Sequence, residues 1–182
     1  MEFKWILIGL IFLLPINIFG LDILPDFLGY AFIIYGLYLI RQFNFKFKLA
    51  MIPVFILLLF SSFLFIDSIF YLINKDSILI HILTSNFNYI LFLLPFKDYS
   101  IIYSIFALLL YYGIHENASK FGYNGLAERS KNLCFLILFY TIITSVPAIM
   151  VLPTIIYSIL IYIITIYELF VIIDARQTLE QR

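Results

Sequence analysis

Few side chains in this sequence have types and spacing suited to chemistry, and they are scattered along the chain. His115 and Glu116 are adjacent, a pairing found in metal sites and in acid–base catalysis. The other histidine, His81, is distant in the sequence, and there is no HExxH motif, cysteine cluster or Walker loop. We therefore expect no metalloprotease and no ATPase. The sequence predicts no catalytic residue, no metal ligand and no cofactor.

Two carboxylates, Asp22 and Asp26, bracket the sequence Ile-Leu-Pro. A carboxylate ahead of a first helical turn accepts backbone N–H bonds and faces the positive end of the helix dipole. Pro25 suits such a turn because its missing donor costs nothing there. We favour this capping interpretation because it accounts for each residue. The alternative is a carboxylate pair that binds a cation or a proton at the outer face.

Glu168 is the one acid placed well inside an apolar run, residues 163–173. A carboxylate inside a membrane is costly, so it marks either a functional site or a structural ion pair. It lies five residues before the end of that run, about 7–8 Å along a helix axis. Arg41 is the first candidate partner, since guanidinium binds carboxylate in a two-pronged geometry. Lys131 is the second, because its aliphatic stem allows it to reach inward.

The composition defines the environment in which these residues must be positioned. Of the 182 residues, 64% are hydrophobic and only 12% are charged, and mean hydropathy is +1.09. Soluble domains carry about 25% charged residues. This excludes a soluble enzyme, a nucleic-acid binder and a disordered regulator. The 11 basic and 11 acidic side chains cancel, so no polyionic partner is expected. The lipid bilayer is the first predicted partner.

Apolar runs of bilayer-crossing length predict one transmembrane domain over residues 1–182, an all-α, six-helix bundle. The predicted spans are residues 4–19, 27–41, 49–66, 99–115, 133–152 and 153–173. We expect the first to be retained, since no small-residue cleavage site follows it. Gly29 and Gly36 lie on nearly one face of the second helix. They predict close packing against the first helix.

Residues 67–98 are predicted to form a partly helical segment outside the membrane. Residues 77–96 contain five polar side chains that hydrocarbon would leave unsatisfied. If this segment lies on the membrane or re-enters it, both termini are cytoplasmic. Nine basic residues then lie on the cytoplasmic side and two on the outer side. If the segment crossed the membrane, five basic residues would lie on the cytoplasmic side and six on the outer side. The nine predicted cytoplasmic bases are Lys4, Arg41, Lys46, Lys48, Lys120, Arg129, Lys131, Arg176 and Arg182.

The last two spans each carry a stripe of small or polar residues on one helical face. The stripes are Thr141, Thr144, Ser145 and Ala148, and Thr154, Ser158, Tyr162, Thr165 and Glu168. Interhelical hydrogen bonds between these two helices are the favoured interpretation. The alternative is a polar path through the bundle.

Short motifs carry a resemblance. The chain contains Leu24-Pro-Asp-Phe-Leu-Gly-Tyr30, then Gly113-Ile-His-Glu-Asn-Ala118 and a closing Asp174-Ala-Arg176. It resembles a group of uncharacterised small polytopic bacterial membrane proteins in which Leu-Pro-Asp-Phe-hydrophobic-Gly-Tyr opens the second helix. The resemblance implies six spans and no particular activity.

The sequence leaves two functions open. The first is a non-enzymatic subunit or regulator of a membrane complex, which fits small loops without a catalytic motif. The second is a small-solute carrier, because six spans in this length resemble the substrate-binding components of energy-coupling-factor transporters. Those use an Ala-xxx-Ala patch in the first helix, where this chain offers only Gly9. A hydrated cavity lined by Glu168, Tyr162 and Asn17 would favour the carrier.

Overall fold

A computed structural model describes the backbone of residues 2–14, 17–18, 21–22, 25–74, 101–145 and 154–179. Side chains are described within 2–14, 25–66, 101–143 and 159–179. The helices in these ranges are α1 (Phe3–Phe12), α2 (Asp26–Ile40), α3 (Phe45–Asn74), α5 (Ile101–Lys120), α6 (Asn124–Ser145) and α7 (Thr154–Leu179). Two short strands, β1 (Asn17–Ile18) and β2 (Leu21–Asp22), pair antiparallel between α1 and α2.

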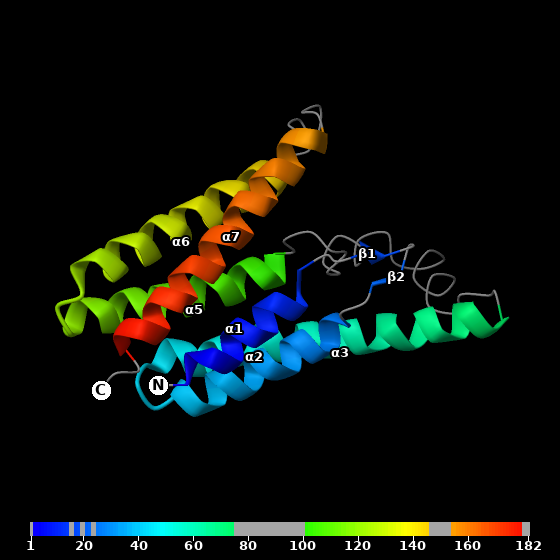
Figure 1. Cartoon of the computed structure of the whole chain (residues 1–182), viewed down its shortest axis with the longest axis horizontal. Coiled ribbons are helices and arrows are strands. Elements are labelled where there is room, and N and C mark those ends of the chain that lie inside the picture. The colour runs from blue at the N-terminus through cyan, green and yellow to red at the C-terminus, as the bar shows by residue number, and fades with distance from the viewer. Residues whose placement is uncertain are drawn as a thin grey trace.

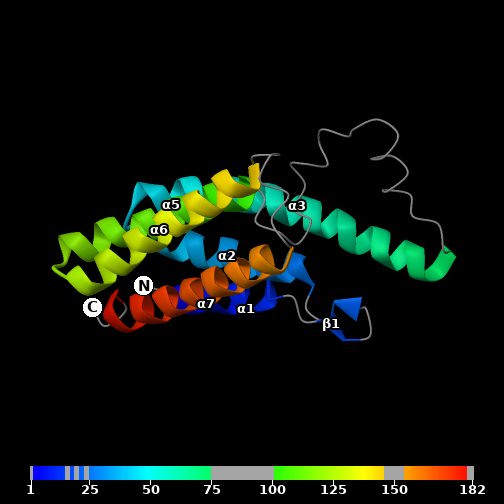
Figure 2. The same ribbon diagram turned by 90° about the horizontal axis from the view of Figure 1, so that it is seen from above.

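The six described helices form a closed ring (Figures 1 and 2). Each helix packs against its neighbours in sequence order, and α7 returns to pack against α1. One hydrophobic cluster, with members from all six, fills the space between them. The two termini, the α2–α3 connection and the α5–α6 turn lie at the same end of the molecule, while α3 projects beyond the other helices at the opposite end (Figure 1).

Glycines allow α1 and α2 to pack closely, as the sequence predicted for Gly29 and Gly36. A Cβ on Gly29 would stand 2.9 Å from the Gly9 carbonyl oxygen, and one on Gly36 would stand 2.9 Å from the Ile6 nitrogen. Gly9 contributes equally, since its Cβ would lie 2.6 Å from the Gly29 carbonyl oxygen. The backbones of α1 and α2 are therefore in contact along this interface, and a side chain at any of these glycines would push the two helices apart.

The outward faces of the ring are strongly apolar. Large hydrophobic side chains are more than half exposed on α3, α6 and α7, for example Ile52, Phe135, Phe139 and Ile166. Among the described residues, one helical segment, Phe45–Ile66, is long and apolar enough to cross a membrane. Helices α1 and α2 are apolar but shorter.

The helices follow the predicted spans but differ at their ends. Helix α3 begins at Phe45 rather than at residue 49, because Asn44 caps it. Helix α5 continues to Lys120, and Gly122, with a φ of 79°, makes the turn into α6. Helix α3 continues to Asn74, so the predicted outer segment 67–98 begins as helix. Residues 75–100, and with them the predicted non-spanning stretch 77–96, lie outside the described residues.

Candidate functional site

Glu168 is buried inside the ring. Its side chain is 1% exposed, and its Oε2 atom accepts a hydrogen bond of 3.0 Å from the Tyr103 hydroxyl. Tyr103 belongs to α5 and Glu168 to α7, two helices that both neighbour α6, so the bond crosses the interior. The Tyr30 hydroxyl on α2 is buried within electrostatic range of Glu168 and of Asp26. The interior of the ring therefore holds a carboxylate that is bonded to a tyrosine hydroxyl.

The predicted ion pairs of Glu168 with Arg41 or Lys131 are not formed among the described residues. Arg41 ends α2 and is exposed, with its guanidinium 3.8 Å from the centre of the Tyr38 ring. Lys131 is also exposed, and its Nζ atom lies 5.9 Å from the centre of the Phe135 ring. Both cations stay at the polar end of the ring, where they keep their water.

Asp26 is the first residue of α2, one position later than a cap. Pro25 occupies the N-cap position, and no side chain caps this end through a hydrogen bond. The Asp26 carboxylate lies in the first turn, where its charge interacts favourably with the helix dipole. Asp22 pairs through its backbone with Asn17 in the small β ladder. Its side chain, and with it the predicted carboxylate pair, lies outside the described residues.

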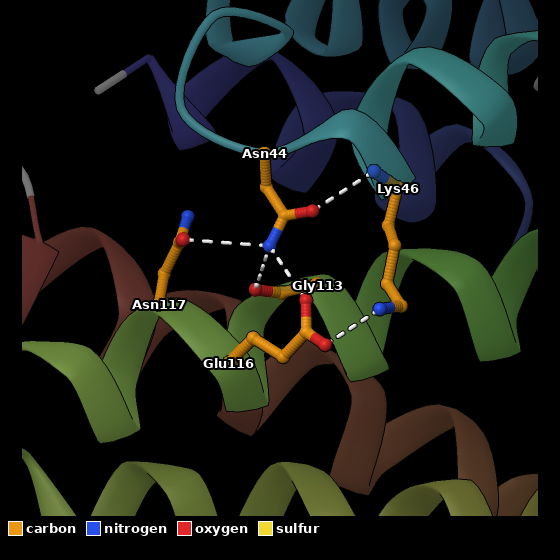
Figure 3. Close-up of polar contacts among 5 residues, drawn as sticks. All are labelled: Asn44, Lys46, Gly113, Glu116 and Asn117. Atoms are coloured by element: carbon orange, nitrogen blue, oxygen red, sulfur yellow. Dashed lines mark hydrogen bonds and ion pairs between the residues drawn. The ribbon is translucent and has the colours of Figure 1, made fainter.

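A second polar cluster joins α3 to α5 (Figure 3). It lies beside the α2–α3 connection, at the end of the ring that carries the termini (Figure 1). We call it the α3–α5 junction: Asn44, Lys46, Gly113, Glu116 and Asn117. The Asn44 Oδ1 atom accepts a 2.9 Å bond from the Lys46 backbone N–H, which caps α3. Its Nδ2 atom donates to Glu116 Oε2 at 3.0 Å, with longer contacts to the Gly113 and Asn117 oxygens. The Asn44 side-chain amide therefore caps α3 and also bonds α3 to α5.

Glu116 and Lys46 carry the opposite charges of this junction. Its Oε1 atom lies 2.6 Å from Lys46 Nζ, and both side chains are about one-third exposed. The hydrogen bonds from Asn44 and then from Lys46 hold the pKa of the Glu116 carboxyl below its usual value. The same ammonium group lies 4.5 Å from the centre of the Tyr112 ring, a cation–π arrangement. Lys46 is therefore fixed by two partners on α5.

The other residues of segment 113–118 have structural contacts of their own. Gly113 makes room for the Phe47 ring, since a Cβ there would come within 2.7 Å of it. His115 donates from Nδ1 to the Ala127 carbonyl oxygen on α6 at 2.8 Å. The Asn117 side chain is 2% exposed, and its Nδ2 atom has no hydrogen-bond partner among the described residues. His115 and Glu116 thus face different helices.

No family model, curated protein or solved structure matches this chain.

From the two polar stripes, the structure describes the side chains of Thr141, Tyr162, Thr165 and Glu168. Thr141 on α6 donates to Ser104 on α5 at 2.8 Å, and Thr165 on α7 donates to the Ile161 carbonyl of its own helix. Tyr162 is 56% exposed on the outer surface. Near the start of α6, Arg129 forms a 2.6 Å ion pair with Asp174 of α7. The remaining stripe residues have side chains outside the described ranges.

The arrangement is suited to holding helices together. Sequence analysis missed Asn44, Lys46 and Tyr103, three side chains that make these interhelical bonds. Asn44 had a usable signal, because an Asn directly before an apolar helical run is a typical N-cap. Tyr103 had no such signal, because nothing in the sequence distinguishes it from the rest of the 14 tyrosines. In the described part of the chain, no three His, Cys, Asp or Glu residues group closely enough to hold a metal ion.

Proposed function

We propose that the chain is a six-span integral membrane protein of the bacterial cell membrane, with both termini in the cytoplasm. We further propose that it acts as a non-enzymatic subunit or regulator of a membrane complex. The outer surface supports the membrane placement. Ile52, Ile142 and Ile166 are each more than 60% exposed, on three different helices. Exposing such an apolar surface to water costs free energy, whereas lipid tails solvate it.

The position of the basic residues supports the orientation. The described bases flank the N-terminus, the α2–α3 connection, the α5–α6 turn and the end of α7, which share one end of the ring (Figure 1). Lysine and arginine concentrate on the cytoplasmic side of membrane proteins. The eight bases at this end are Lys4, Arg41, Lys46, Lys48, Lys120, Arg129, Lys131 and Arg176.

The packed centre of the ring is the observation that supports the proposed role as a subunit or regulator. A carrier needs a hydrated path past its binding residues, and the sequence offered Glu168, Tyr162 and Asn17 for it. Glu168 is instead 1% exposed and bonded to Tyr103, while Tyr162 faces outward. The Asn17 side chain lies outside the described residues. Polar side chains used to hold helices together favour a structural or regulatory membrane protein over a carrier.

The test uses the full chain, cross-linked in its native membranes and then purified in mild detergent. We expect it to remain in the membrane after alkaline washing and to copurify with one membrane protein at a fixed ratio. Vesicles containing the chain alone should show neither solute uptake nor proton flux. A flux that Glu168→Gln abolishes would replace the proposal with a carrier, and recovery of the chain without a partner would also contradict it.

A further inference from the structure

An apolar pocket of about 480 Å³ opens between α5 and α6, and Lys46 of the α3–α5 junction contributes to its lining. Its walls are Leu108 and Leu109 from α5 and Cys134, Phe135 and Leu138 from α6. Phe135 is 60% exposed and Leu138 is 41% exposed, so this pocket lies on the outward surface rather than in the core. In the membrane placement proposed above, it faces lipid.

Basic side chains gather at one end of this pocket. Lys46, His115 and Lys131 complete its lining together with Tyr112. Helix α5 runs toward the cytoplasmic end and α6 runs away from it, so His115 and Lys131 lie at that end. Leu108 and Leu138 lie about two turns further toward the middle of the membrane. The pocket is therefore polar at the membrane surface and apolar within the membrane.

The charge at this polar end is positive. Glu116 offsets Lys46 through their 2.6 Å ion pair. Lys131 has no carboxylate within ion-pair distance in the described part of the chain, and its ammonium is exposed. His115 uses Nδ1 to donate to the Ala127 carbonyl, which leaves Nε2 as its other polar atom. A monovalent phosphate group would complement Lys131 here.

We infer that this pocket binds an anionic phospholipid of the cytoplasmic leaflet. The phosphate lies between Lys131 and Lys46, and one acyl chain follows the α5–α6 groove past Cys134 and Leu138. Basic pockets between transmembrane helices on the cytoplasmic side suit anionic headgroups in this way. The inference rests on the proposed membrane placement and orientation, but not on the proposed role as a subunit.

The test compares lipids that differ only in headgroup. The full chain, in detergent with equal amounts of phosphatidylglycerol and phosphatidylcholine of the same acyl chains, is analysed by native mass spectrometry. We expect phosphatidylglycerol to be retained preferentially. Lys131→Gln should reduce that preference about fivefold, since each lysine near a surface contributes about 1 kcal/mol to anionic lipid binding. Lys48→Gln, the same charge change at the same end but outside the pocket, should leave it nearly unchanged.

A second pair of variants tests the acyl groove. Leu138→Trp should fill the pocket and reduce retention of both lipids, whereas Ile166→Trp, on the exposed face of α7, should not. Equal retention of the two lipids, or equal effects of Lys131→Gln and Lys48→Gln, would overturn the site and leave the groove to a partner helix. A chain that alkaline washing releases from membranes would overturn the membrane placement itself.

Discussion

Glu116 gives the α3–α5 junction a dependence on pH. Its bonds with Asn44 and Lys46 lower the pKa of its carboxyl from the ordinary 4.5. A carboxyl whose pKa is lowered by folding stabilises the protein above its unfolded pKa, and that contribution is lost as pH falls through the folded value. The junction should therefore be intact at neutral pH and weaken under acid.

We predict that Glu116→Gln lowers the free energy of unfolding by about 1 kcal/mol at pH 7, because the pair is partly exposed. At pH 3 the deficit should shrink, since the wild-type carboxyl then approaches its protonated form. Thermal unfolding of the detergent-solubilised protein at both pH values measures this. Glu128→Gln, on the exposed face of α6, is the control and should change little. A deficit of equal size at both pH values would contradict the electrostatic account.

The hydrogen bond between Tyr103 and Glu168 leads to a second prediction. Tyr103→Phe removes a donor to a buried carboxylate and should cost about 1–3 kcal/mol of stability. Glu168→Gln should be milder than Glu168→Ala, because the amide oxygen still accepts the bond and no cavity forms. Thermal unfolding in detergent again measures the change. Tyr162→Phe, on the exposed face of α7, is the control, and an equal loss there would contradict the assignment.

At the residue scale, the sequence identified the unusual groups better than their partners. Glu168 stood out because an acid in an apolar run needs a partner, and the structure places one beside it. Arg41 was the wrong partner because a guanidinium at a helix end can remain in water and lie over Tyr38. Which tyrosine reaches the carboxylate depends on how α5 and α7 pack around α6. No local pattern encodes that arrangement.

Between elements, the α1–α2 contact depends on glycine. We predict that Gly29→Ala destabilises the protein, because the new Cβ would stand 2.9 Å from both the Gly9 carbonyl oxygen and a Leu13 methyl. The backbones would have to separate, at an expected cost of about 1–3 kcal/mol. Gly125→Ala, in the first turn of α6 with open space around it, should be neutral or slightly stabilising. Equal stability of the two variants in thermal unfolding would contradict close packing here.

The start of α2 gives a milder prediction. Asp26→Asn should cost only about 0.3–1 kcal/mol, because it removes the interaction of the charge with the helix dipole without removing a cap. Thermal unfolding and expression level check this. Loss of function with unchanged stability would indicate a charge-dependent site at Asp26 instead.

Helix positions were largely predictable, whereas helix ends were less so. Apolar runs located α2 to within one residue at each end. Helix α5 extends past residue 115 because Asn117 and Ala118 are buried against neighbouring elements, although they are not part of an apolar run. The start of α3 was missed because Asn44 joins two helices by capping one and bonding the other.

At the scale of the whole molecule, the ring closes through α1 and α7, the two ends of the chain. The α2–α3 and α5–α6 contacts follow from short connections, but the α1–α7 contact does not. It joins two helices that are far apart in the sequence and that both carry buried residues, Phe3 and Ile6 on α1 and Val171 and Ala175 on α7. Six predicted spans did not specify this closure.

The last prediction tests the orientation of the ring in the membrane. If both termini are cytoplasmic and residues 77–96 do not cross, reporter fusions after Lys75 and after Lys97 should both report the outside. A fusion after Lys120, in the α5–α6 connection, should report the cytoplasm and serves as the control. The physical reason is that the eight described bases gather at the end of the ring that holds this connection, where the cytoplasmic bias of lysine and arginine places them. Opposite locations for the Lys75 and Lys97 fusions would instead make residues 77–96 a seventh span. The basic end could then no longer be assigned to a single side of the membrane.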